Sequence, residues 1–384
     1  MEICKYDDCT GCFACYNICP VNCISIEPDK YGELHPIIDE KKCINCKSCI
    51  KVCPGNKKDI NLLEPIKCYA AYRLDKQQRL NSASGGIGTV LSEAVIDNDG
   101  IVIGVKFDKE IIPRHTIATT LNEIEDFKGS KYVQSRIDDI YKKIKFYLNK
   151  NRKVLFIGTP CQISGLKMYL NNIEYENLIT CDLICHGVSS YKYLQENLKN
   201  NIDSKISKIS FRSNDPKANF RFRVFFENKI IYNKRWFMNN YFLAFLSGIS
   251  LRDSCYKCKY ACSKRISDIT IGDFFGLGKN EVFTGNPDNA SVVLINTLKG
   301  QELFDKIKNK IFFQERNYIE AIKGGISLRK PFPMHKKRNK FKILYLKMGF
   351  DKSIDKLMIW DKMKYFYILI IRYLKRRLFF RNKR

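Results

Sequence analysis

The sequence has no apolar run long enough to cross a bilayer, and its first eight residues lack the basic region and apolar core of a signal peptide. We therefore expect a cytoplasmic protein, in a compartment that keeps thiols reduced. The 384 residues include 17 cysteines, an odd number, so disulfide pairing cannot account for all of them. In a reducing compartment such thiols more often bind metal than form bridges.

Acidic residues are scarce, with 40 Asp and Glu against 67 Lys and Arg, which gives a formal net charge of +27. This excess favours acidic partners such as nucleic acid, anionic lipid or a phosphorylated ligand. No zinc-finger, RNA-recognition or helix-turn-helix signature is present, so we expect no nucleic-acid partner. About half of the excess lies in residues 336–384, which hold 17 Lys and Arg against three Asp. We treat this basic tail as a separate segment.

Two cysteine runs share the spacing Cys-x2-Cys-x2-Cys-x3-Cys-Pro at an offset of 34 residues. This is the spacing of bacterial two-cluster ferredoxins, in which the fourth cysteine of each run ligates the other cluster. A pair of zinc sites is the alternative, although such sites usually show separated Cys-x2-Cys pairs. We predict a ferredoxin-like domain over residues 1–64 with two [4Fe-4S] clusters, one on Cys9, Cys12, Cys15 and Cys53, the other on Cys19, Cys43, Cys46 and Cys49.

Residues 65–335 change in pattern. Apolar strand-like runs at 101–105 and 154–157 alternate with helical stretches such as 89–96 and 137–148. The fold class that we predict is therefore α+β or mixed α/β, with a small two-cluster ferredoxin domain followed by a larger mixed α/β domain.

A third thiol set in this larger domain has the spacing Cys-x2-Cys-x3-Cys at Cys255, Cys258 and Cys262. Another [4Fe-4S] cluster on it needs a fourth ligand. Cys161 and Cys185 both follow apparent strands, whereas Cys181 falls inside one and is expected in the core. The set alone is also compatible with zinc or with a purely structural role.

Short motifs accompany these thiols. Residues 82–88 read Ser-Ala-Ser-Gly-Gly-Ile-Gly before a helical stretch, a pattern that suits either a phosphate at a helix N-terminus or a flexible turn. Further motifs are Lys-Tyr-Val-Gln-Ser at 131–135, Gly-Thr-Pro-Cys-Gln-Ile-Ser-Gly-Leu-Lys at 158–167, Cys-His-Gly-Val-Ser-Ser at 185–190, Phe211-Arg212 and Asp-Ile-Thr-Ile-Gly-Asp-Phe-Phe-Gly at 268–276. In this order, over residues 66–335, they resemble the beta subunits of coenzyme F420-reducing hydrogenase and F420-dependent formate dehydrogenase.

The resemblance implies an FAD, a [4Fe-4S] cluster beside it and, in archaeal members, a deazaflavin substrate. Carried over by motif, the candidates for the flavin and substrate pocket are Ser82, Ser84, Gly85, Gly86, Lys131, Tyr132, Ser135, Gly158, Thr159 and His186. The third cluster's ligands become Cys255, Cys258, Cys262 and one of Cys161 or Cys185. Two features depart from the family pattern: Phe275 stands where tryptophan is common, and the basic tail is not part of it.

The resulting functional prediction is an iron–sulfur flavoprotein oxidoreductase. It passes electrons between ferredoxin-type clusters and, through FAD, coenzyme F420 or another small reducible substrate, with a ferredoxin-like protein or redox subunit as partner. One alternative is a non-catalytic electron-relay subunit of a larger redox complex. Because some bacterial relatives are encoded beside polysaccharide-modifying enzymes, a reductase associated with polysaccharide biosynthesis is another. Lys131 and Arg212 are expected to pair with anionic groups or to be ordinary surface charges.

The basic tail shows helical periodicity. Its apolar positions are Trp360, Met363, Tyr367, Ile370, Leu374 and Leu378, with Lys364, Arg372, Lys375 and Arg376 on other faces. This pattern predicts an interfacial helix on an anionic membrane, which would place the protein peripherally at the inner face. Packing of the stripe on the protein's own core is the alternative.

Overall fold

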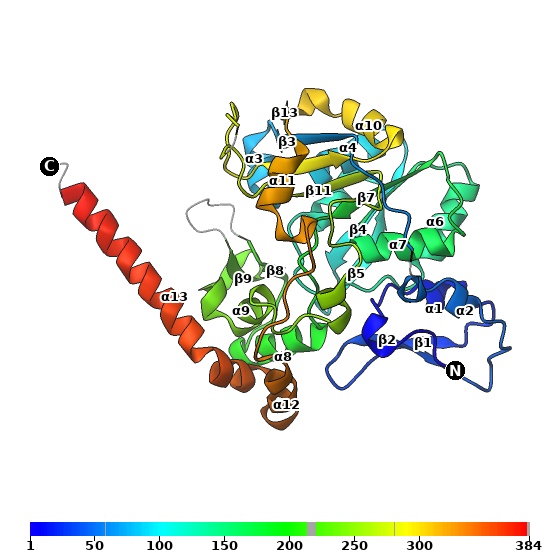
Figure 1. Ribbon diagram of the computed structural model, residues 1–384, viewed down its shortest axis with the longest axis horizontal. Coiled ribbons are helices and arrows are strands. Elements are labelled where there is room, and N and C mark those ends of the chain that lie inside the picture. The colour runs from blue at the N-terminus through cyan, green and yellow to red at the C-terminus, as the bar shows by residue number, and fades with distance from the viewer. Residues whose placement is uncertain (58, 213–219, 280, 382–384) are drawn as a thin grey trace.

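The computed structural model describes residues 1–57, 59–212, 220–279 and 281–381, the last ten of them as backbone only. The N-terminal domain contains a two-stranded antiparallel sheet of β1 (Ile24–Pro28) and β2 (Leu34–Ile38). Its helices are η1 (Tyr6–Asp8), α1 (Ala14–Ile18), α2 (Ser48–Lys51) and η2 (Pro54–Asn56). Figure 1 shows this domain at one side of the larger body, next to α6 and α7.

The two cysteine runs fold in the same way. Gly11 and Phe13 have positive φ angles of 63° and 64°, and their equivalents Asn45 and Lys47 have 52° and 59°. Two left-handed residues between the cysteines curl each run into a tight loop, and a short helix starts directly after the second of them. Gly11 lies close to the larger domain, since a Cβ on it would lie 2.2 Å from Nε2 of the Gln134 side chain.

The larger domain is built on an eight-stranded mixed sheet, which confirms the predicted mixed α/β class. Its order is β13 (Ile311–Glu315), β3 (Lys67–Arg73), β12 (Ser291–Ile295), β11 (Ile269–Asp273), β7 (Leu178–Leu183), β6 (Val154–Gly158), β4 (Ile101–Phe107) and β5 (Pro113–Ala118). Strands β4, β6, β7 and β11 are mutually parallel, and the outer pairs are antiparallel. Since β3 and β11 are both antiparallel to β12, β3 runs in the same direction as the parallel strands.

Helices cover both faces of the sheet (Figure 1). Helices α4 (Ile87–Ile96) and α10 (Leu298–Asp305) contribute to the core on one face, and α6 (Ile140–Asn149) and α7 (Pro160–Tyr169) to the core on the other. Alternate residues of the central strands enter alternate cores, as a pleated strand requires: Leu155 enters the first, Val154 and Phe156 the second. Cys12, Phe13 and Ala14 of the N-terminal domain join the second core.

A second unit of the body combines elements that follow β7 with the two C-terminal helices. It consists of a sheet of β8 (Lys208–Ser210), β9 (Arg221–Phe226) and β10 (Lys229–Arg235), with helices α8 (Tyr191–Asn201), α9 (Asn240–Leu246), α12 (Arg338–Met348) and α13 (Phe350–Arg381). These elements share an aromatic-rich core of their own. The remaining short elements are α3 (Lys76–Leu80), α5 (Leu121–Ile124), η3 (Glu125–Phe127), η5 (Trp236–Met238), η6 (Asp253–Lys257), η7 (Lys308–Lys310), α11 (Tyr318–Gly324) and η8 (Ile326–Leu328).

Element boundaries differ from the sequence expectation where polar side chains or backbone pairs intervene. The helix expected from residue 137 begins at Ile140, because Arg136 pairs with β5 and Asp138 adopts a left-handed turn. Helix α7 begins at Pro160, directly after β6, because Thr159 and Gln162 form a capping box. Over the described residues no helix combines the length and apolarity that a bilayer crossing requires.

His115 of β5 makes the stability of the fold sensitive to acid. The side chain is 4% exposed and stacks on Phe156, and burial lowers the pKa of His115 to about 4. Below the ordinary pKa near 6.5, the unfolded chain binds a proton that the folded chain does not, so stability present above that pH is lost as pH falls toward 4. We expect about 1.4 kcal/mol less unfolding free energy at pH 5.5 than at pH 7.5 from this group.

Anaerobic urea unfolding of the wild type and of His115→Phe at the two pH values measures this effect. The variant keeps the stacked ring and should lose that part of the pH dependence. An identical pH dependence in both proteins would show that His115 is not the titrating group.

Candidate functional site

The candidate site lies at one edge of the large sheet. Strands β3, β11, β7, β6 and β4 run in the same direction, so their carboxyl ends meet there. Thr159 follows β6 directly, Cys185 and His186 follow β7, and Asp273 ends β11. Ligands of open α/β sheets bind outside the carboxyl ends of the strands, and this edge carries most of the motifs found in the sequence.

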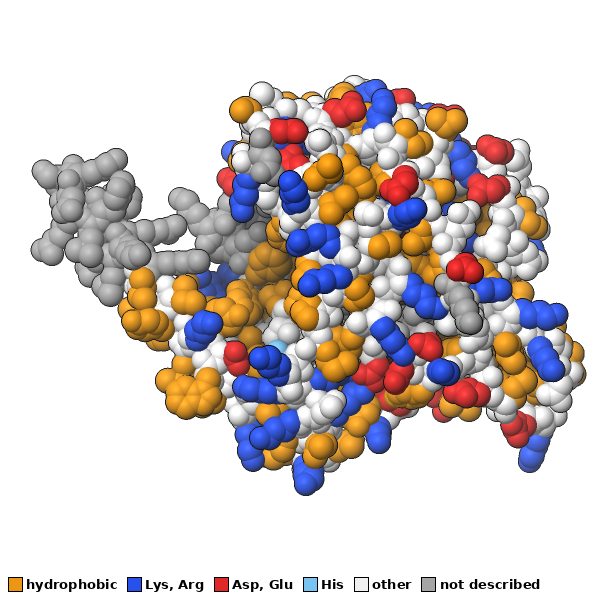
Figure 2. All heavy atoms as spheres, in the orientation of Figure 1, with side chains coloured by type: hydrophobic (Ala, Val, Ile, Leu, Met, Phe, Trp, Pro, Cys, Tyr) orange, Lys and Arg blue, Asp and Glu red, His pale blue; other side chains and the backbone are white. Residues whose placement is uncertain are grey.

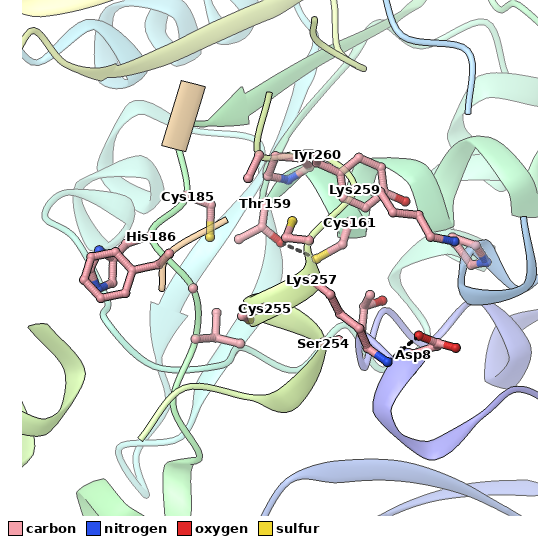
Figure 3. A pocket seen from close by; sticks show the side chains of 18 of the residues that line it. Asp8, Thr159, Cys161, Cys185, His186, Ser254, Cys255, Lys257, Lys259 and Tyr260 are labelled. Atoms are coloured by element: carbon pink, nitrogen blue, oxygen red, sulfur yellow. Dashed lines mark hydrogen bonds and ion pairs between the residues drawn. The ribbon is translucent and has the colours of Figure 1, made fainter. Parts of the chain in front are cut away.

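Four thiols border one hollow at this edge, which measures about 750 Å³ including space open to solvent. Cys161 comes from the first turn of α7, Cys185 from the loop after β7, and Cys255 and Cys258 from η6 and the residue that follows it. Figure 3 shows Cys161 beside Thr159, whose Oγ1 lies 3.2 Å from the thiol sulfur. Thr159 and His186 border the same hollow.

Cys262, the third cysteine of the predicted set, is not among the residues that border the hollow. Its sulfur lies 3.4 Å from the carbonyl oxygen of Lys264 and 3.8 Å from that of Lys259, as a thiol donor would. The structure thus brings both Cys161 and Cys185 together with Cys255 and Cys258. The sequence predicted only one of Cys161 and Cys185 as the fourth ligand. Cys181 is fully buried in β7 and packs in the core, as expected.

A buried ion pair fixes the loop that carries these thiols. Arg265 and Asp182 are almost fully buried, and Nη2 of Arg265 lies 3.0 Å from Oδ1 of Asp182. Nη1 of the same guanidinium donates to the carbonyls of Tyr260 and Cys262. The sequence analysis missed this pair, although a lone aspartate inside an apolar strand is a signal that it needs a buried partner.

Burial disfavours thiolates in this hollow. It raises the pKa of Cys185 to about 12 and also raises the pKa values of Cys161 and Cys255. Four desolvated thiols therefore suit a ligand that supplies positive charge and takes sulfur donors, which is the chemistry of an iron–sulfur cluster. The donor set fits such a group.

The ferredoxin-like loops border two further hollows. One is lined by Cys9, Cys12, Cys15 and Cys53, together with Cys4, and the other by Cys19, Cys43, Cys46 and Cys49, together with Cys23. Each hollow thus gathers the four cysteines that the crossed ferredoxin pattern assigns to one cluster. Among the described residues, no three His, Cys, Asp or Glu side chains converge as ligands of a single metal ion. The thiols line cavities instead of closing on one point.

We call the hollow of Cys9, Cys12, Cys15 and Cys53 the first, that of Cys19, Cys43, Cys46 and Cys49 the second, and the hollow at the sheet edge the third. Helix α7 joins the first hollow to the third. A Cβ built on Gly165 would lie 3.0 Å from the sulfur of Cys12 and 3.0 Å from the hydroxyl of Tyr141. Cys161 stands four residues earlier on the same helix, one turn or about 6 Å along its axis. A thiol of the first set and a thiol of the third set therefore lie on either side of one helical turn.

Arg252 holds the N-terminal domain against this region and is 1% exposed. Its Nε donates to the carbonyl of Cys9 at 2.7 Å, Nη2 to that of Leu34 at 2.9 Å, and Nη1 to Oε1 of Gln134 at 3.1 Å. Its own carbonyl accepts from the backbone N–H of Cys255 at 3.0 Å. Arg252 thereby touches the loops of the first and third thiol sets, and no sequence motif pointed to it.

The candidate flavin residues at 82–86 lie at the same edge, at the start of α4. Ser84 Oγ donates to the carbonyl of Ala290 at 3.2 Å, and the N–H of Gly85 donates to Oγ of Ser291 at 2.9 Å. Gly85 is needed for close packing, since a Cβ there would lie 2.5 Å from the carbonyl oxygen of Ala71. Gly86 precedes the helix in a left-handed conformation, and no side chain caps the helix N-terminus.

The other candidates make internal contacts. Lys131 Nζ donates to the carbonyls of Asp126, Phe127 and Lys128 at 2.9–3.0 Å, so all three of its N–H donors have a partner. The ring of Tyr132 stacks on that of Phe245 at 4.9 Å. Gln162 Nε2 donates to Oγ of Ser135, while Gln162 Oε1 accepts from the N–H of Thr159.

Two of the ten candidates, Thr159 and His186, therefore border the thiol-lined hollow. His186 packs on Phe332 and Phe245 there. The remaining eight are not among the residues that border it: Ser82, Ser84, Gly85, Gly86, Lys131, Tyr132, Ser135 and Gly158. Arg212 pairs with Asp273 at 2.9 Å, so this cation has an internal partner as well.

Residues 151–321 match the family described as the C terminus of the coenzyme F420 hydrogenase/dehydrogenase beta subunit. Residues 8–57 and 35–86 match two descriptions of the 4Fe-4S dicluster domain. Residues 151–321 thus match this oxidoreductase family, and residues 8–86 match the dicluster iron–sulfur domain. The resemblance drawn from the motifs is confirmed over these residues.

A chain of the F420-reducing [NiFe] hydrogenase complex from Methanosarcina barkeri, solved as a xenon derivative, is similar in structure. The two share 22% sequence identity over 78% of this chain and 92% of that chain, with a TM-score of 0.46. At this level the comparison adds no functional argument. No curated protein matches this chain in sequence.

The contact between α7 and Cys12 generates a prediction. Gly165→Ala places a methyl group 3.0 Å from two atoms of Cys12 and from Tyr141, so helix and loop must separate slightly. We expect about 1–3 kcal/mol lower unfolding free energy from overpacking, and an altered spectrum of the N-terminal clusters. Lys167→Ala, on the same helix and partly exposed, is the control and should change neither. Equal stability of both variants would show that the contact is loose.

Proposed function

We propose that this chain is an iron–sulfur flavoprotein oxidoreductase. It would transfer electrons between an electron-transfer protein and, through FAD, a small reducible substrate such as the deazaflavin coenzyme F420. The observation that carries the proposal is the succession of three thiol-lined hollows, which leads from the exposed Cys46 to the carboxyl edge of the sheet. The match of residues 151–321 to an oxidoreductase family supports it.

The third hollow would hold a [4Fe-4S] cluster on Cys161, Cys185, Cys255 and Cys258. These four thiols border it together, whereas Cys262 faces backbone carbonyls. The ion pair of Arg265 and Asp182 holds the loop that carries Cys258 in place, and the carbonyl of Arg252 fixes the position of Cys255. This assignment replaces Cys262 in the predicted set by the second of the two upstream cysteines.

Electrons would enter or leave at the second hollow. Cys46 is the most accessible of the eight ferredoxin cysteines, and hydrogen bonds from the Ser48 side chain and backbone lower the pKa of its thiol. Lys47 borders the same hollow, Lys51 is close enough to lower the pKa of the Cys46 thiol, and both lysines are exposed. A small acidic electron carrier fits this basic surface, because opposite charge steers the encounter and a short distance between centres speeds transfer.

A flavin would supply the exchange between a hydride, which carries two electrons, and the single electrons of the clusters. The uncapped N-terminus of α4, preceded by Ser84, Gly85 and Gly86, offers backbone N–H groups to a phosphate. Thr159 and His186 border the thiol-lined hollow at the carboxyl edge of the same sheet. Lys131, whose ammonium is committed to three carbonyls, would act as a positioning residue for the turn at 126–128.

An electron-relay subunit without its own substrate is the second candidate. It is favoured by one observation: only Thr159 and His186 of the ten candidates border the hollow that the four cysteines line. Flavin content with turnover in the isolated chain separates the two functions.

Iron analysis tests the third ligand set. Protein purified without oxygen should contain about 12 irons per chain, four for each cluster. Cys185→Ser should lower this to about eight, since one of four ligands is lost, whereas Cys262→Ser should leave it unchanged. Loss of four irons in Cys262→Ser but not in Cys185→Ser would overturn the assignment. Zinc in place of the missing iron would remove the redox role of this site.

Anaerobic stopped-flow measurements test the two halves of the reaction. Reduced ferredoxin and a hydride donor, either reduced F420, NADH or NADPH, should each reduce the bound flavin of the wild type. Cys12→Ala removes a ligand of the first cluster, so it should block reduction by ferredoxin and leave reduction by the hydride donor. Cys68→Ala, a buried cysteine that borders none of the hollows described here, is the control. Failure of all three hydride donors would favour the relay function.

A further inference from the structure

Helix α13 carries two apolar faces on opposite sides. On the inner side Phe350, Ile354, Leu357 and Met358 are buried in the core shared by α8, α9 and α12, and Tyr365 and Leu369 pack against it. This face accounts for the attachment of the helix to the body. Figure 1 shows α13 extending away from the body beyond this contact.

The outer side carries an exposed stripe. It comprises Ile359, Trp360, Met363, Phe366, Tyr367 and Ile370, whose residues are 44–71% exposed. Positions 359, 363, 366 and 370 recur at helical spacing, with 360 and 367 one step beside them, so the six side chains share one face. With the helical angle of 100° per residue, this stripe lies on the side opposite the inner face.

The exposure argues against one of the two expectations for the tail, packing of the stripe on the core. Trp360 is 71% exposed, so the stripe does not pack on the core of its own chain. The inner face, made of other residues, does that. The predicted positions Leu374 and Leu378, like the predicted cations Arg372, Lys375 and Arg376, have side chains outside the described residues.

The charge beside the stripe is positive and is not neutralised locally. Lys352, Lys356 and Lys364 are exposed, and the first two continue the line of the stripe toward the helix N-terminus. The three acidic residues of 336–384 are engaged elsewhere: Asp355 pairs with Lys362, Asp361 with Lys337, and Asp351 accepts from Asn197, Asn200 and Asn240. Figure 2 shows hydrophobic and basic side chains together where this segment leaves the body.

We propose that the outer face of α13 binds an anionic phospholipid surface, with Trp360, Phe366 and Tyr367 at the level of the lipid headgroups. An aromatic-rich stripe beside lysines is the pattern of a helix that lies in a membrane interface, where amphipathic rings are favoured and cations meet lipid phosphates. The exposed lysines Lys352, Lys356 and Lys364 strengthen the attraction, since each cation near an anionic leaflet contributes. The proposal is independent of the substrate of the redox site.

A fluorescence and co-sedimentation experiment tests it on the full chain. Only Trp236 and Trp360 are present, so Trp236→Phe leaves Trp360 as the sole tryptophan reporter. Vesicles of phosphatidylcholine with about one third phosphatidylglycerol should bind the protein and shift the Trp360 emission to shorter wavelength. Raising salt from about 0.1 to 0.5 M should weaken binding several-fold, because it screens the charges.

A matched pair of variants locates the surface. Trp360→Gln, Phe366→Gln and Tyr367→Gln combined should weaken co-sedimentation with anionic vesicles by about tenfold or more, because most of the inserted apolar area is lost. Leu298→Gln with Ile173→Gln, which are 75% and 57% exposed on other parts of the molecule, should leave it unchanged.

Three results would overturn the proposal. Equal binding to pure phosphatidylcholine would remove the anionic lipid from it. Undiminished binding of the triple variant would place the contact on another surface. A dimer in sedimentation velocity that the triple variant converts to monomer, without vesicle binding by either protein, would assign the stripe to a second copy of this chain.

Discussion

The arrangement of the site depends on one buried guanidinium. Arg252 takes carbonyl partners from Cys9 and Leu34 of the N-terminal domain and an amide partner from Gln134 of the body, while its own backbone accepts from Cys255. A cation with so little exposure is stable only when its donors are paired, and loss of one such partner costs about 1–3 kcal/mol. Arg252 thus fixes the loop of Cys9 relative to the loop of Cys255. Electron transfer between clusters on these two loops would require such a fixed spacing.

The mixed sheet contributes the second constraint. Because five of its strands run in one direction, their carboxyl ends bring Thr159, Cys185 and Asp273 to one edge from positions that together span more than a hundred residues of the sequence. Helix α7 then continues from that edge to Cys12. The redox centres would therefore meet where the parallel strands end, and the N-terminal domain needs only a short contact to join them.

Several residues of the family motifs make internal contacts that build this edge of the sheet. Lys131 holds a turn through three carbonyls, Gly85 allows the close approach of Ala71, and Gln162 links Ser135 to the capping residue Thr159. The presence of these motifs in the sequence therefore reflects contacts within the protein at this edge of the sheet. Tail helix α13 shows the converse case: its inner face is ordinary core, while its outer face carries apolar and basic residues that the fold itself does not use.

The sequence by itself determined what depends on local spacing. The crossed sets of ferredoxin cysteines, the mixed α/β class, the burial of Cys181 and the helical stripe around Trp360 all follow from periodicities of two to seven residues or from a repeat of 34. Only the tertiary structure decided which thiols meet in the third hollow. Cys161, Cys185, Cys255 and Cys258 come from three separate elements, and their convergence depends on strand order and on the buried contacts of Arg252 and Arg265. Spacing assigned Cys262 to that set, and its role as a ligand stays a prediction, since its sulfur lies 3.4 Å from the carbonyl oxygen of Lys264 and the residue does not border the hollow.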